Sequence, residues 1–236
     1  MSSNNNFLPD LISEGHSGVS PFSRRNFLRY AGTSVGIIAV ASACKKDDNN
    51  GGSVGAGVDL GANDIGILNY AYALEQLEAA FYIKVVNSQY SGITAEETAY
   101  LTDIRNHEIA HREFFKNALG DKKIVDLEVD FSTIDFSSRD SVLNTAKAFE
   151  DLGVSAYNGA GKLIADVNYL LFAGKIVSVE ARHAALIRDL LVEGSFADET
   201  VIDANGLEKS KTPAEVLVIA KTYIKTSINA SNLPTS

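Results

Sequence analysis

The sequence contains one cysteine, Cys44, in 236 residues, which excludes an internal disulfide and a zinc site built on several thiolates. Proline is scarce as well: none occurs between positions 21 and 213, so long helices are allowed there. Basic residues are the minority, with 21 Lys and Arg against 30 Asp and Glu and a net charge of −9. Because phosphate binding needs a concentrated basic face, no nucleic acid partner is expected.

The first 43 residues are predicted to be a twin-arginine signal peptide. Arg24 and Arg25, followed by Asn-Phe-Leu, resemble the twin-arginine export signal, and an apolar run over residues 31–43 comes directly after. This run is too short to span a bilayer as a permanent helix and fits the core of a signal peptide. The alternative is a short membrane-proximal helix that happens to follow two arginines.

Cys44 ends the apolar run and is the predicted lipidation site. Residues 41–43, Ala-Ser-Ala, resemble a lipoprotein cleavage box, although Ala41 stands where Leu is commonest. Residues 44–61 are charged at first and then rich in glycine, which predicts a lipid-anchored flexible tether. The expected product is a periplasmic or cell-envelope lipoprotein, attached to the membrane through Cys44. Cleavage after Ala43, which would give a soluble exported protein, is the alternative.

The folded domain is expected over residues 62–236. Four long helices are predicted, over residues 63–87, 94–119, 140–163 and 167–192. Asn63 or Asp64 is the expected N-cap of the first helix, and Thr94 with Glu97 predicts a capping box at the second. Gly153, Gly159 and Gly161 lie in or near the third helix and predict close packing or a kink there.

Two connections complete the predicted fold. Residues 121–138 alternate apolar and polar side chains, which predicts an extended crossover with room for a short strand. Thr212, Pro213 and Glu215 predict the start of a short fifth helix. The fold class is therefore predicted to be all-α: a four-helix bundle with a long crossover between the second and third helices and a short C-terminal fifth helix.

Two Glu-x-x-His pairs lie on the second and fourth predicted helices: Glu108 with His111, and Glu180 with His183. Residues three apart on a helix face the same way, so each pair presents a carboxylate and an imidazole together. The helix face around Glu180 is otherwise apolar and points its carboxylate into a core. A buried carboxylate needs a partner.

The helix before each pair carries a Glu-x6-Tyr motif: Glu75 with Tyr82, and Glu150 with Tyr157. The domain thus consists of two helical hairpins of one kind, and this ligand set is the one that ferritin-like two-metal carboxylate bundles use. The six predicted ligands are Glu75, Glu108, His111, Glu150, Glu180 and His183. Carboxylate and imidazole without thiolate suit iron or manganese, so two ions of either metal are the predicted cofactors.

Two points stay open: which glutamate of the first helix is the ligand, and what role the tyrosines of the first and third helices have. Glu78 borders the same apolar stripe as Glu75 and is an alternative ligand, although the spacing to Tyr82 favours Glu75. Tyr82 and Tyr157 are either hydrogen-bond donors behind the ligands or fillers of the core.

Residues 107–111 also fit the zinc-hydrolase pattern His-Glu-x-x-His. In that interpretation His107 and His111 bind zinc, and Glu108 activates a water molecule. It needs a third ligand that no downstream helix offers convincingly, and it leaves the second Glu-x-x-His pair unexplained. The two-metal interpretation is therefore favoured, with His107 as a partly exposed neighbour or a residue behind the ligands.

Three segments, residues 74–82, 149–160 and 179–185, resemble the ferritin-like domain family that includes plant and bacterial desiccation-related proteins. The resemblance covers most of residues 63–225 and implies a ferritin-like four-helix bundle with a two-metal site at the six residues above. The expected function is an exported metalloprotein that acts on peroxide, oxygen or ferrous iron in stress protection. A non-catalytic structural or partner-binding envelope bundle is the alternative. No mineral core is expected in a tethered chain, and homo-oligomer formation is left open.

Overall fold

The computed structural model describes residues 57–235. The predicted signal peptide over residues 1–43, the lipidation site at Cys44 and most of the predicted tether lie outside this range and stay predictions. Within it, no helix combines the length and the apolar character that a membrane span requires.

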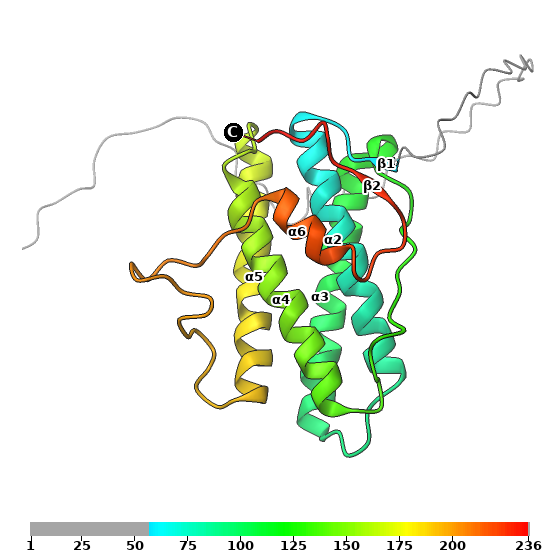
Figure 1. Ribbon diagram of the computed structural model, residues 1–236, viewed down its shortest axis with the longest axis vertical. Helices are drawn as coiled ribbons and strands as arrows, with labels where there is room; N and C mark the ends of the chain where they lie inside the picture. Colours follow the sequence, from blue (N-terminus) through cyan, green and yellow to red (C-terminus); the bar gives the residue numbers. More distant parts are fainter. Residues whose placement is uncertain (1–56, 236) are drawn as a thin grey trace, which may run out of the picture. The chain divides into compact units, whose positions relative to one another are not determined.

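Four long α-helices form the domain. They are α2 (Asn63–Asn87), α3 (Ala95–Leu119), α4 (Arg139–Gly161) and α5 (Val167–Leu191). Helix α2 packs along α3 and α4 packs along α5, while α2 and α4 join the two hairpins (Figure 1). A short helix, α6 (Pro213–Ala220), packs against α4. The structure confirms the predicted all-α bundle with its short fifth helix.

The connection from α3 to α4 begins with a 3-10 turn, η1 (Gly120–Lys122), and continues as extended chain. Figure 1 shows it running the length of the bundle, so α3 and α4 point in the same direction. Two polar side chains of α2 hold it in place. Ile124 N donates to Asn69 Oδ1 at 2.9 Å, and Leu127 N donates to Gln76 Oε1 at 2.8 Å. The long crossover is thus confirmed, and the strand allowed for there is reduced to an isolated bridge between Val129 and Ile224.

The helix starts are partly as predicted. The capping boxes at Thr94 and at Thr212 are both present. The prediction of Asn63 or Asp64 as the N-cap of α2 is wrong, because Ala62 occupies that position and makes no side-chain cap bond. The Asp64 carboxylate instead accepts from the backbone N of Ala165 and of Asp166, both at 2.8 Å, and so fastens the turn between α4 and α5.

The packed domain begins slightly before the predicted boundary at residue 62. Strand β1 (Val58–Asp59) pairs in parallel with β2 (Ile228–Asn229), and the side chain of Leu60 is fully buried. These contacts tie the start of the domain to its C-terminal segment. The last residues of the predicted tether therefore belong to the fold.

Close packing explains two of the three glycines in α4. A Cβ at Gly153 would lie 3.0 Å from Glu78 Oε1. A Cβ at Gly159 would lie 1.8 Å from the carbonyl oxygen of Lys211, in the segment before α6. A Cβ at Gly161 would make only an ordinary contact, 3.8 Å from Leu170. The predicted close approach is thus confirmed at Gly153 and Gly159.

Candidate metal centre

The six predicted ligands meet in the interior of the bundle. Glu75 comes from α2, Glu150 from α4, and one Glu-x-x-His pair each from α3 and α5. All four glutamates are fully buried, and His183 is 4% exposed. His111 lies closest to solvent, with 12% of its side chain exposed. The inner face of every long helix therefore contributes to one polar cluster.

The cluster divides into two groups whose donor atoms lie within 4.8 Å of one another. The first group is Glu75, Glu108, His111 and Glu180, and the second is Glu108, Glu150, Glu180 and His183. Glu108 and Glu180 belong to both groups. Glu108 and Glu180 could therefore contribute to holding both ions of a pair, and Glu75 and Glu150 to holding one ion each.

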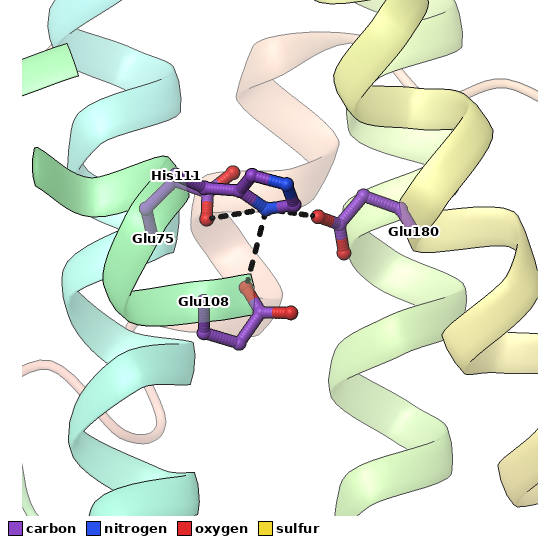
Figure 2. Close-up of side chains that lie close together, drawn as sticks. All are labelled: Glu75, Glu108, His111 and Glu180. Atoms are coloured by element: carbon purple, nitrogen blue, oxygen red, sulfur yellow. Dashed lines mark ion pairs between the residues drawn. The ribbon is translucent and has the colours of Figure 1, made fainter. Parts of the chain in front are cut away.

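In the first group the imidazole of His111 faces three carboxylates (Figure 2). Its Nδ1 lies 2.8 Å from Glu180 Oε1, 3.5 Å from Glu75 Oε2 and 3.8 Å from Glu108 Oε2. The nearest carboxylate is that of Glu180 on α5. The farthest is that of Glu108, which lies on α3 with His111 itself. The Glu-x-x-His pair on α3 is therefore completed by a residue from the opposite hairpin.

The second group repeats this geometry with the hairpins exchanged. His183 Nδ1 lies 2.9 Å from Glu108 Oε1, 3.4 Å from Glu150 Oε2 and 3.7 Å from Glu180 Oε2. Here too the nearest carboxylate belongs to the other hairpin. The two groups are related as the two halves of the sequence are.

The tyrosines of the Glu-x6-Tyr motifs bond across the bundle. Tyr82 of α2 donates its hydroxyl to Glu150 Oε1 on α4, and Tyr157 of α4 donates to Glu75 Oε1 on α2. Of the two roles left open, hydrogen-bond donor is thus the one found. Each bond occupies one carboxylate oxygen and leaves Oε2 facing an imidazole. The crossed pairing was missed from sequence, where the only signal was the equal spacing.

The donor atoms of the cluster fit metal ions. The Nδ1 atoms of both histidines, Oε2 of Glu75 and Glu150, and both oxygens of Glu108 and Glu180 are buried without a hydrogen bond of acceptable geometry. Buried polar atoms normally have a hydrogen-bond partner. The convergence of so many atoms without one therefore points to a bound ion as their partner. An oxygen and imidazole donor set of this kind suits iron or manganese.

Without a metal ion, burial and the neighbouring charges shift the pKa values of the carboxylates and imidazoles in the cluster. Burial and repulsion by Glu180 raise the pKa of Glu108 well above its ordinary value, and burial raises the pKa of Glu150 to about 7. Burial disfavours the charged imidazoles, but the surrounding carboxylates outweigh it and raise the pKa of His111 and of His183 to about 12. Protons on the two imidazoles thus offset part of the carboxylate charge, and a metal ion would displace them.

His107 lies outside both groups. It is exposed, and its Nδ1 lies 2.9 Å from Nε2 of His183, on the side of that ring away from the carboxylates. The two rings stack with centroids 5.1 Å apart. His107 therefore supports His183 from behind, and the structure does not bring it into a group with His111 as a zinc-hydrolase site would require.

Glu78 lies outside both groups as well, although it is only 3% exposed. Of the two candidates on α2, the structure thus places Glu75 among the converging donors. Glu78 is a further buried carboxyl on the same face of the helix.

Comparison with known proteins agrees with this architecture. The ferritin-like domain family matches residues 63–193, which span all four long helices and make up more than half of the chain. None of the curated proteins compared with the chain matches it. With the family matched over the whole bundle and its carboxylate and imidazole cluster, this chain belongs to the ferritin-like domain family.

Proposed function

We propose that the protein is an exported metalloprotein that binds two iron or manganese ions and acts on small oxidants or on ferrous iron in stress protection. The observation that carries the proposal is the pair of donor groups sharing Glu108 and Glu180, with their buried and unsatisfied donor atoms. In a bundle with a purely structural role, apolar residues at these positions would give a more stable protein, because buried charge is costly.

Each ligand has a distinct expected task. Glu108 and Glu180 would bridge the ions, and His111 and His183 would each bind one. Glu75 and Glu150 would hold one ion each, with the unused oxygen fixed by a tyrosine hydroxyl. Two such ions would supply electron transfer between divalent and trivalent states.

The charge balance supports a divalent pair. Four ionised carboxylates carry four negative charges, and two neutral imidazoles carry none. Two divalent ions would cancel that charge within a core from which water is largely excluded. This balance fits any divalent pair, and the carboxylate and imidazole ligands, with no thiolate among the six residues, are the reason for proposing iron or manganese.

The cellular location is part of the proposal and depends on the leader. The twin-arginine pattern and the cleavage box before Cys44 favour a lipoprotein of the periplasm or cell envelope. Twin-arginine export carries folded proteins and so allows metal loading before export. Membrane fractionation of the parent and of Cys44→Ser tests the anchor: the parent is expected with membranes and the variant in the soluble fraction.

The metal site is tested by elemental analysis of residues 53–236, purified without chelator, beside the double variant Glu150→Ala, Glu180→Ala. The parent is expected to hold two iron or manganese ions per chain and the double variant to lose them. A matched control replaces two glutamates outside the cluster with Ala, the exposed Glu96 and the half-buried Glu113, and should keep the metal. Turnover of hydrogen peroxide and oxygen consumption with ferrous iron would then identify the reaction.

Two results would contradict the proposal. One zinc ion per chain, retained in the double variant, would favour a hydrolase site at His107 and His111. No metal in the parent after attempted reconstitution would favour the alternative of a non-catalytic structural or partner-binding bundle.

A further inference from the structure

The first two turns of α5 carry an apolar patch on the surface of the domain. Its members are Val167, Leu170, Leu171 and Phe172, which are 73%, 44%, 56% and 39% exposed. Val167, Leu170 and Leu171 follow the spacing i, i+3, i+4 and so share one face of α5. Four of the ten large apolar side chains that are exposed within residues 57–235 thus fall within six consecutive positions. Such a cluster, unlike single exposed apolar residues, marks a surface that binds protein or membrane.

The patch lies at the end of the bundle where the chain enters the domain. Asp64, in the first turn of α2, accepts from the backbone N of Ala165 and of Asp166, directly before the patch. Figure 1 shows β1, the start of α2 and the start of α5 at this same end. The chain segment that leads to Cys44 therefore leaves the domain, at Gly57, from the end that carries the patch.

The predicted lipid anchor would keep this end close to a membrane. Cys44 precedes Gly57 by 13 residues, which span at most about 45 Å even when fully extended. The 25 residues of α5 alone make a helix about 37 Å long. A surface at the opposite end of the bundle could therefore reach the bilayer only with the connecting chain close to full extension. The patch can reach the bilayer without that extension.

Lysines accompany the patch. Lys175 Nζ lies 5.6 Å from the ring centroid of Phe172, a member of the patch. The carbonyl of Lys122 accepts from Asn69 Nδ2 at 2.9 Å, which fixes the end of α3 beside the first turns of α2. The lysines exposed at this end are Lys122, Lys123, Lys162 and Lys175. They offset the nearby acids, which are Asp59, Asp64, Asp121 and Asp166.

The opposite end of the bundle is acidic. Its exposed acids are Glu96, Asp135, Asp140, Asp189 and Glu193, with Lys84 as their exposed counterpart. An anionic lipid surface would repel this end, whereas the lysines at the other end would face lipid phosphates favourably. Charge and exposed apolar area thus favour the same end of the molecule for contact with a membrane.

We infer that the apolar patch is the surface by which the anchored domain rests on the membrane. Its four side chains enter the interfacial layer of a phospholipid surface, and the lysines around it face the phosphate groups. The anchor at Cys44 holds the protein at the membrane, and the patch determines which side of the bundle faces the lipid. The inference rests on the proposed cell-envelope location and does not depend on the metal ions.

The test attaches the chain from residue 44 to vesicles of phosphatidylethanolamine and phosphatidylglycerol. Its only cysteine, Cys44, is coupled to a maleimide lipid. This coupling does not depend on acylation in the cell, so failure of the inference is distinguishable from failure of the proposed anchor. The chain has no tryptophan, and Leu171→Trp therefore places a unique fluorescent reporter in the patch. Leu207→Trp is the matched control, at a leucine 64% exposed between α5 and α6.

The emission of Leu171→Trp is expected to shift to shorter wavelength on the vesicles and to be quenched by brominated phospholipid, because the indole enters the lipid. Leu207→Trp should keep the emission of the unattached protein. Adding Val167→Ser and Leu170→Ser to the patch reporter should abolish the shift and the quenching. Adding Leu207→Ser and Val218→Ser, at exposed positions outside the patch, should leave both intact.

Unchanged emission of Leu171→Trp on the vesicles would overturn the inference and leave the metal site and the anchor untouched. Equal quenching of the two reporters would also overturn it, because the contact with lipid would then be unspecific. A shift that grows with protein concentration without vesicles, and that brominated lipid does not quench, would overturn it in favour of a second copy of the chain. If Leu171→Trp fails to fold, Val167→Trp replaces it, at a position 73% exposed.

Discussion

Tyr82 and Tyr157 each donate a hydrogen bond to a ligand of the opposite hairpin, Glu150 and Glu75 respectively. Both phenols are fully or nearly buried, and burial, with the nearby carboxylates, raises the pKa of each well above its ordinary value. Both tyrosines therefore remain protonated donors at neutral pH. A donor behind a ligand orients that ligand and is expected to matter almost as much as the ligand itself.

Tyr82→Phe removes the hydroxyl that bonds to Glu150 Oε1. A buried acceptor is then left unsatisfied, so the metal-free protein should lose about 1–3 kcal/mol of unfolding free energy. Binding of the ion at the second group should weaken roughly 10–100-fold. Urea denaturation and metal titration measure the two effects. Tyr100→Phe, which removes an exposed bond to Glu96, is the control, and equal behaviour of the two variants would refute the assignment.

Gly159 is the glycine whose replacement the structure least tolerates. In Gly159→Ala the new Cβ would meet the backbone of Lys211, which cannot move as a flexible side chain does. The unfolding free energy should fall by about 1–3 kcal/mol, as for other overpacked sites. Gly161→Ala, in the same helix but without that clash, should be neutral or gain up to about 1 kcal/mol from helix propensity. Thermal or urea unfolding of both variants compares them, and equal stabilities would argue against this contact.

At the level of helices, the start of α3 is fastened to α4. Glu97 closes the capping box with Thr94, and its carboxylate accepts from Arg139 Nε at 2.7 Å. Burial alone would favour the neutral acid, but these bonds outweigh it and lower the pKa of Glu97. One side chain thus completes a helix terminus and joins the two hairpins.

Glu97→Gln should lower the unfolding free energy at pH 7 by about 1–2 kcal/mol, because a charge-assisted bond is lost. A carboxyl whose pKa is lower in the folded protein contributes stability above its unfolded pKa, near 4.3, and loses it as pH falls through the folded pKa. The difference between parent and variant should therefore shrink on acidification. Urea denaturation at pH 7 and at successively lower pH checks this, and a gap that widened in acid would contradict it.

Across the whole molecule, the apolar core is built around a polar cluster drawn from every long helix. Four buried carboxylates repel one another, and in the metal-free protein protonated imidazoles and tyrosine hydroxyls offset that repulsion in part. The bundle therefore retains residues that cost stability unless an ion is bound. Metal binding should couple to the stability of the entire domain, because the ligands come from all four helices.

Metal loading should raise the melting temperature of the parent domain and leave that of the Glu150→Ala, Glu180→Ala variant unchanged. In the metal-free state the variant should be less stable than the parent, because Tyr82 and both imidazoles lose carboxylate partners and two buried side chains are truncated. Calorimetry with added Fe²⁺ or Mn²⁺ under anaerobic conditions, and with chelator, measures both. If added metal left the melting temperature of the parent domain unchanged, this would count against a site shared by four helices.

Much of this protein is determined locally by its sequence. The helix spans follow from apolar periodicity, and the capping boxes at Thr94 and Thr212 were predictable because they involve residues three apart. The convergence of the six side chains was also predictable, since i and i+3 positions share a helix face and the motif is repeated.

Tertiary structure decided what depends on residues far apart in the chain. It placed Glu75 and not Glu78 in a donor group, and it crossed the tyrosines so that each serves the other hairpin. Asp64, which the sequence predicted as a candidate helix cap, accepts instead from the backbone of the turn before α5. Periodicity gives the face on which a side chain lies, but which neighbour it meets there depends on how the hairpins pack, and that is settled only when the whole bundle is assembled.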